Sequence, residues 1–96
     1  MLYYKPEEWD ALEPVAVEYC NEHGLGKALE YINETVCDAW KLLIRYRNDS
    51  LSRDMARMRS YEAYGMYNAL LIHANECGRD DVWQAIYNWG HYSVFY

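Results

Sequence analysis

"KALEYINETVCDAWKLLIRYR", residues 27–47, decides the fold class of this chain. Within it, apolar residues recur at intervals of three and four: Leu29, Ile32, Val36, Trp40 and Leu43. This spacing places them on one side of an α-helix, because 3.6 residues make one turn. The stretch therefore predicts a long amphipathic helix that packs its apolar stripe against the rest of the protein.

Two prolines and two glycines divide the chain before this stretch. Pro6 suits the first turn of a short helix, where no intrahelical N–H bond is needed. Pro14 either kinks that helix or starts a new one over residues 14–23, because the residue before proline avoids helical geometry. Gly24 and Gly26 are then expected to end it, as glycine often does just past a helix.

After the stretch, the tripeptide "NDS" interrupts the helical pattern. Ser50 or Ser52 is placed to cap a third helix, expected over residues 53–77, since serine side chains accept bonds from the first amides of a helix. Gly78 follows its expected end.

Residues 81–89, "DVWQAIYNW", predict a fourth helix, which Asp80 or Asp81 is placed to cap and which ends near Gly90. The tail "HYSVFY", residues 91–96, either extends this helix or pairs as a strand with residues 1–4, "MLYY". The sequence leaves both alternatives open.

These segments predict an all-α fold, a small antiparallel bundle of three to four helices. The 96 residues suffice for a single helical domain over residues 1–96. A chain of this length buries roughly 60–65% of its unfolded surface, which is enough for one core without disulfides.

Charge and composition exclude several classes of function. Nine Lys and Arg residues against fifteen Asp and Glu give a net charge of −6, which argues against general affinity for nucleic acid or for an anionic membrane. No apolar run approaches the length of a membrane span, and "MLYYKPEEWD" lacks the features of a signal peptide. The odd number of cysteines, three, fits reduced thiols. We expect a cytoplasmic protein without a membrane partner.

The third predicted helix carries apolar residues on two sides. One side is predicted to be core: Ala56, Ala63, Tyr67, Leu70, Ala74 and Cys77. Nearly opposite lies the outer ridge, a mixture of residues typical of interface hot spots: Arg57, Tyr61, Tyr64, Asn68 and Ile72. Gly65 lies among them, and a glycine inside a helix costs roughly 1 kcal/mol relative to alanine, so it predicts close approach of another backbone. Either the helix is buried on both sides within the chain, or the outer ridge binds a partner protein.

Six of the nine positive residues lie between residues 41 and 59. Four of them form what we call the basic elbow: Arg45, Arg47, Arg53 and Arg59. In one interpretation these residues, together with Lys41 and Arg57, form ion pairs with carboxylates near the start of the chain. Those carboxylates are Glu7, Glu8, Asp10 and Glu13. The alternative is a nucleic-acid-binding regulator, because arginine contacts phosphate and the neighbouring tyrosines can stack on single-stranded bases.

Glu30, Glu34 and Asp38 follow one another at four-residue spacing on the second helix, about 6 Å apart along its axis. This pitch is near the phosphate spacing of a nucleic-acid strand, so the acidic face is a candidate nucleic-acid mimic. In charge and size the chain resembles small acidic helical proteins that imitate DNA, such as some phage inhibitors of restriction or CRISPR enzymes. The alternative is an ordinary solvent-exposed face, in which these carboxylates form ion pairs along the helix surface with Lys27 and Lys41.

Cysteine and histidine occur as two spaced pairs, Cys20 with His23 and His73 with Cys77. Two Cys and two His could form a tetrahedral zinc site in a small metal-stapled structural subunit. We expect no metal and no cofactor, because Cys77 belongs to the predicted apolar face of its helix. We also expect no catalytic residues, since neither an orienting group nor an oxyanion site accompanies these pairs.

The sequence therefore favours a non-enzymatic protein-binding module. A small acidic inhibitor of a nucleic-acid-handling enzyme, of the anti-restriction or anti-CRISPR type, fits this class. Its expected partner is another protein or a second copy of the chain. The alternatives are the regulator that binds nucleic acid through the basic elbow and the metal-stapled subunit.

Overall fold

A computed structural model describes residues 11–45 and 49–91 of the protein, with only the backbone of Leu43, Arg45 and Ser52. Within these residues the helices are α1 (Pro14–Glu22), α2 (Gly26–Arg45), α3 (Ser50–Glu76) and α4 (Asp80–Trp89). The described part of the chain contains no strand, and the predicted all-α bundle is confirmed. The expected strand pairing of the termini falls on residues 1–4 and 92–96, which lie outside the described ranges.

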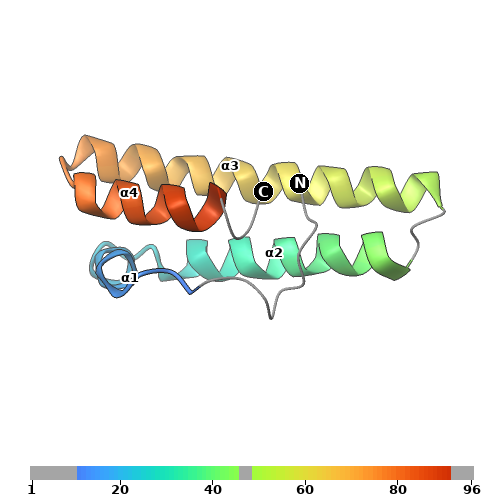
Figure 1. Ribbon diagram of the computed structural model, residues 1–96, viewed down its shortest axis with the longest axis horizontal. Coiled ribbons are helices and arrows are strands. Elements are labelled where there is room, and N and C mark those ends of the chain that lie inside the picture. The colour runs from blue at the N-terminus through green and yellow to red at the C-terminus, as the bar shows by residue number, and fades with distance from the viewer. Residues whose placement is uncertain (1–10, 46–48, 92–96) are drawn as a thin grey trace.

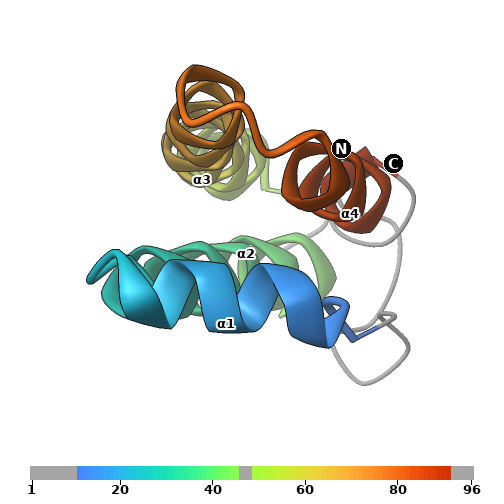
Figure 2. The ribbon, with the colours of Figure 1, turned by 90° about the vertical axis from the view of Figure 1, so that its left-hand side faces the viewer.

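Two long helices set the shape of the molecule. Figure 1 shows α2 and α3 running antiparallel along the long axis, with α4 folded back antiparallel beside the second half of α3. α1 is short and lies across this axis, as Figures 1 and 2 show together, at the end where α2 begins and α3 ends. The carboxylates near the start of the chain were expected to pair with the basic elbow, and for Glu13 this is wrong: it directly precedes α1, which lies at the end of the molecule opposite the α2–α3 turn.

Matching glycine turns end α1 and α3. Gly24 and Gly78 have φ angles of 70° and 68°, a left-handed conformation that glycine adopts without a steric penalty. After α3, the Arg79 amide donates to the Ala74 carbonyl at 3.0 Å, which satisfies a carbonyl that the helix leaves without an internal partner. The predicted role of Gly26 as a second stop is wrong, since it is the first residue of α2.

The starts of α3 and α4 also differ from expectation. Asp49, and not Ser50 or Ser52, caps α3, and its carboxylate accepts from the Leu51 amide at 3.2 Å. Arg79 occupies the cap position of α4 and makes no side-chain capping bond. The predicted caps Asp80 and Asp81 lie in the first turn instead, where their charge is still favourable to the helix dipole.

The core fills the space between the four helices, and α1 contributes Ala16, Tyr19 and Cys20 to it. Ile32 and Val36 of α2 are fully buried, while Leu29 and Trp40 of the predicted stripe are half-buried. Of the predicted core face of α3, five residues are buried: Ala56, Ala63, Tyr67, Leu70 and Ala74. Cys77, by contrast, is exposed, because it lies in the turn that ends the helix.

Large and small core residues are distributed unevenly along the long axis. The half of the molecule near α1 and α4 buries large side chains, among them Tyr19, Tyr67 and Ile86. Toward the α2–α3 turn the described buried residues are mostly small: Val36 is the largest, and the others are Ala39, Ala56, Ser60 and Ala63. None of the described helices combines the length and apolarity needed to cross a membrane.

Candidate protein-binding surface

The outer ridge of α3 is exposed to solvent. The exposed fraction is 67% for Tyr61, 58% for Ile72 and 47% for Tyr64. Arg57 is also exposed, and Asn68 is half-buried. The interpretation in which α3 is buried on both sides within the chain is therefore wrong. The five residues predicted for partner binding lie on one accessible side of a single helix.

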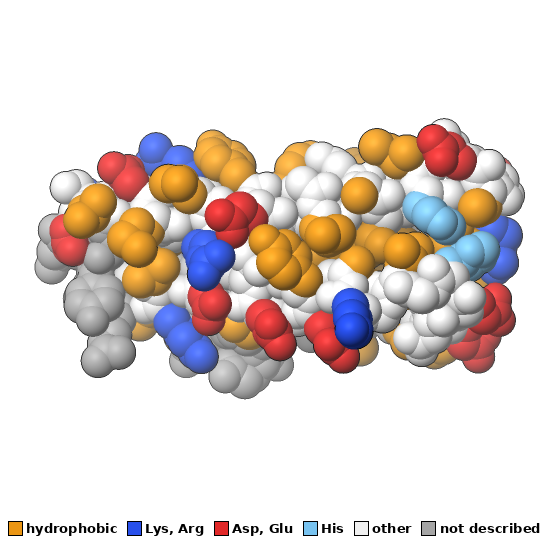
Figure 3. Space-filling view, turned by 180° about the vertical axis from the view of Figure 1, so that it is seen from behind, with side chains coloured by type: hydrophobic (Ala, Val, Ile, Leu, Met, Phe, Trp, Pro, Cys, Tyr) orange, Lys and Arg blue, Asp and Glu red, His pale blue; other side chains and the backbone are white. Residues whose placement is uncertain are grey.

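The apolar outer face extends beyond these five residues toward the start of α3. Leu51 and Met58, which are 67% and 63% exposed, lie on the same side of the helix. Leu51, Met58, Gly65 and Ile72 recur every seven residues, and because seven residues make nearly two turns they form one line. Figure 3 shows this side of the molecule, with orange side chains along the upper edge, where α3 lies. The seven-residue spacing was the signal in the sequence that could have identified Leu51 and Met58.

Gly65 lies in the middle of this line and has no close neighbour among the described residues. A Cβ atom built on Gly65 meets nothing within 4 Å. The idea that Gly65 lets another helix of the same chain come close is therefore not supported by the structure. Its cost to the helix, roughly 1 kcal/mol relative to alanine, is not offset by packing at this position within the chain.

The arginines beside the ridge pair along α3 itself. Arg59 donates to Glu62 at 3.0 Å, and this carboxylate raises the pKa of the Arg59 guanidinium. Arg57 lies 4.0 Å from Asp54. Both are exposed pairs of the i,i+3 type, worth a few tenths of a kcal/mol each. Both of these arginines therefore have an acidic partner within α3 itself.

The two residues of the basic elbow whose side chains are described, Arg53 and Arg59, do not lie together in one patch. Arg53 is exposed at the start of α3, whereas Arg59 is close enough to Asp38 of α2 for that carboxylate to contribute to its raised pKa. The side chain of Arg45, the whole of Arg47, and the proposed acidic partners Glu7, Glu8 and Asp10 lie outside the described part of the structure.

The acidic face of α2 is solvent-exposed at Glu30, Glu34 and Asp38. Lys27 and Lys41 are exposed on the same helix. Positive charge flanks the three carboxylates, with Lys27 before Glu30, and Lys41 and Arg59 near Asp38. Only three carboxylates therefore follow one another, so the row imitates a short piece of a phosphate backbone at most.

Comparison of the chain with protein-family models, curated proteins and solved structures finds no match. The resemblance to DNA-imitating phage inhibitors accordingly stays one of charge and size. The function has to be inferred from the surfaces of the chain itself.

The two histidine–cysteine pairs meet at the end of the molecule where α1 and α3 terminate. The rings of His23 and His73 lie 5.1 Å apart, and the buried Tyr19 hydroxyl lies 2.5 Å from His73 Nδ1. Burial, with a contribution from the Cys77 side chain, raises the pKa of Tyr19 to about 12. The hydroxyl therefore keeps its proton at neutral pH, and it also donates to the His73 carbonyl at 3.3 Å, which ties α1 to the end of α3.

This end does not assemble a metal centre. Cys77 Sγ is 3.9 Å from His73 Nδ1, but that nitrogen already bonds the Tyr19 hydroxyl. Cys20 is buried, and burial raises the pKa of its thiol, whereas metals bind the thiolate. Across residues 11–45 and 49–91, no three His, Cys, Asp or Glu side chains are grouped to hold an ion. Cys77 is exposed, so the buried Cys77 on which that expectation rested is wrong.

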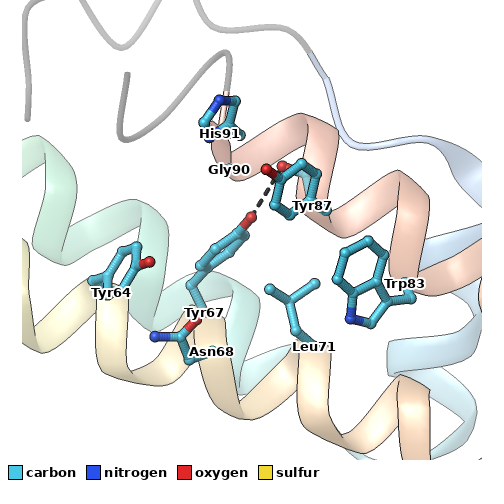
Figure 4. A pocket seen from close by; sticks show the side chains of 8 residues that line it. All are labelled: Tyr64, Tyr67, Asn68, Leu71, Trp83, Tyr87, Gly90 and His91. Carbon is cyan, nitrogen blue, oxygen red and sulfur yellow. Dashed lines mark hydrogen bonds between the residues drawn. The ribbon is translucent and has the colours of Figure 1, made fainter.

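A cavity between α3 and α4 was missed by sequence reasoning. It measures about 230 Å³ and is lined mainly by aromatic side chains, which Figure 4 shows. The rings of Trp83, Tyr87 and His91 stack in a row, with centroids 5.0 and 5.2 Å apart. Across from them, the buried Tyr67 donates to the Tyr87 carbonyl at 3.0 Å. The four-residue spacing of the three rings was visible in the sequence and indicated this stack.

Proposed function

We propose that the protein is a non-enzymatic protein-binding module that acts through the outer ridge of α3. The observation that carries the proposal is the line of exposed apolar residues on this face, centred on Gly65, which no other described residue approaches. Exposed apolar residues scattered singly need no explanation, whereas a contiguous set marks an interaction site. Tyrosine and arginine beside such a set are the residues that most often dominate binding energy.

The geometry of the ridge fits a helical partner. Leu51, Met58, Gly65 and Ile72 form a straight seam of side chains along one helix, which is the arrangement that receives the ridge of a second helix. A helix that crosses at Gly65 can approach the α3 backbone closely, because no side chain projects there.

The wider proposal is a small acidic inhibitor of a nucleic-acid-handling enzyme, acting in the cytoplasm. The net charge of −6 and the exposed carboxylates of α2 support it, because such an enzyme presents a basic groove to its partners. In this arrangement the outer ridge supplies binding energy, and the acidic face steers the encounter.

The test combines Tyr61→Ala and Tyr64→Ala in one protein and measures capture of the binding partner from the native host. Loss of hot-spot aromatics typically costs about 2 kcal/mol, so we expect about 30-fold weaker capture. Tyr31→Ala is the matched control, since Tyr31 is an exposed tyrosine (39%) on α2. Circular dichroism checks that each variant keeps its helices. Unchanged capture by the double variant contradicts the proposal, and so does loss of its fold, which would show that the tyrosines are structural.

A further inference from the structure

We infer that the aromatic cavity between α3 and α4 receives an arginine side chain of the partner protein. The inference rests on the proposed function, because it names the group that the partner of the outer ridge inserts there. Tyr64 and Asn68 belong to the outer ridge and also line the cavity, so a partner that lies along the ridge reaches the cavity directly. The size of the cavity, the shape of its walls and its charge specify the inserted group.

The cavity has room for one side chain. It measures about 230 Å³, which is below the roughly 300–1,000 Å³ of small-molecule sites. Gly90 leaves the space against α4 in which the ring of Tyr67 lies, since a Cβ atom at this position would overlap that ring. The cavity is thus matched in size to a single residue that projects from the surface of a partner.

The walls suit a planar group. On α4 the rings of Trp83 and Tyr87 are nearly parallel, with 8° between their planes and 5.0 Å between their centroids. Parallel rings in contact have planes about 3.5 Å apart, so these two are displaced sideways by about 3.6 Å, and part of each face stays uncovered. His91 continues the row at 9° to Tyr87. A planar group can stack on such a surface, whereas a tetrahedral ammonium group is held best by a cage of rings at steep angles.

The charge of the site favours a cation. The structure describes all eight residues that line the cavity, and none of them is lysine or arginine. The faces of tyrosine and tryptophan rings are electron-rich and attract a positive group. The side-chain carbonyl of Asn68 can accept a hydrogen bond from that group, and the net charge of −6 attracts a basic partner. Among protein side chains, arginine supplies a planar group that is always charged.

The test titrates the full chain with a capped glycine–arginine–glycine tripeptide and follows the side-chain amide signal of Asn68 by NMR. A second tripeptide carries citrulline, which has the shape of arginine without the charge. A cation over aromatic rings typically improves binding by about 5-fold, so we expect the citrulline peptide to bind about 5-fold more weakly.

Variants locate the binding site. Trp83→Leu should weaken binding of the arginine peptide by about 5-fold, whereas Trp83→Phe, which keeps a ring, should stay within about 3-fold of the parent. Tyr31→Leu is the matched control, because it removes an exposed ring from the acidic α2 and should leave binding unchanged. Circular dichroism checks each fold. If Trp83→Leu fails to fold, the comparison of the two peptides on the parent chain and on Trp83→Phe still decides.

Each outcome bears on one part of the inference. Equal binding of the two peptides, or no binding of the arginine peptide, overturns the assignment of a cation. Tighter binding of free methylguanidinium than of the arginine peptide overturns the protein side chain, because the cavity would then take a small molecule. Neither result touches the proposed function: loss of partner capture by the Tyr61 and Tyr64 double variant would still uphold the outer ridge as the binding surface.

Discussion

Gly65 and Gly90 both have a helical backbone conformation, but the space available for a side chain differs completely between them. A Cβ atom at Gly65 meets only open space, whereas at Gly90 it would overlap the ring of Tyr67. That ring cannot move aside easily, because Tyr67 is 3% exposed and its hydroxyl is bonded to the Tyr87 carbonyl. Gly90 has φ −69° and ψ −42°, so its backbone suits any residue, and the requirement for glycine is one of space alone.

Alanine substitution should therefore have opposite effects at these two positions. Gly90→Ala should destabilise the fold by about 1–3 kcal/mol, because the added methyl group overpacks the contact with Tyr67. Gly65→Ala should stabilise it by about 0.5–1 kcal/mol, since alanine restricts the unfolded chain and fits the exposed helix. Urea unfolding of both variants gives the comparison. Equal effects, of either sign, would contradict the assigned surroundings.

At the scale of the element, helix existence was predictable and helix ends were only partly so. The periodicity of α2 and the glycines after α1 and α3 act locally, so the sequence carries them directly. The caps were misplaced by one to three positions, because Asp49, Ser50 and Ser52 all have side chains that can cap. The local pattern therefore does not select among them. Which side of α3 is exposed depends on where α2 and α4 pack, and the pattern of α3 alone did not determine this.

The cap of α3 can be tested directly. Asp49→Ala removes the acceptor of the Leu51 amide and should cost about 1 kcal/mol of stability. Ser50→Ala is the matched control: Ser50 is exposed and already inside the helix, so its loss should change stability by less than about 0.5 kcal/mol. Thermal unfolding of both proteins decides the assignment. If Ser50→Ala lowered stability more than Asp49→Ala does, Ser50 and not Asp49 would be the capping residue.

At the scale of the whole molecule, the position of α1 could not be read from the sequence. Pro14 starts a new helix, as one alternative allowed, but the direction of α1 depends on long-range contacts. Tyr19 reaches His73 across 54 positions of sequence, and no local pattern encodes that contact. For the same reason, neither the contact between the two histidines nor the aromatic cavity could be predicted from the sequence, because both depend on contacts between residues far apart in the chain. The outer ridge was predictable as a surface, and its exposure required the packed structure.

The uneven core has a consequence for how the protein opens. Large side chains are buried near α1 and α4, whereas the described core toward the α2–α3 turn consists mainly of small residues: Ala39, Ala56, Ser60 and Ala63, with Val36 as the largest. Less apolar area holds that half together, so it should unfold locally at lower free energy than the remainder. In native-state hydrogen–deuterium exchange, amides of residues 53–60 should exchange about 10-fold or more faster than those of residues 67–74 of the same helix. Uniform protection along α3 would show that the helix opens only as one unit with the whole fold. With graded protection, the first half of the outer ridge would be the part that can readjust when a partner binds.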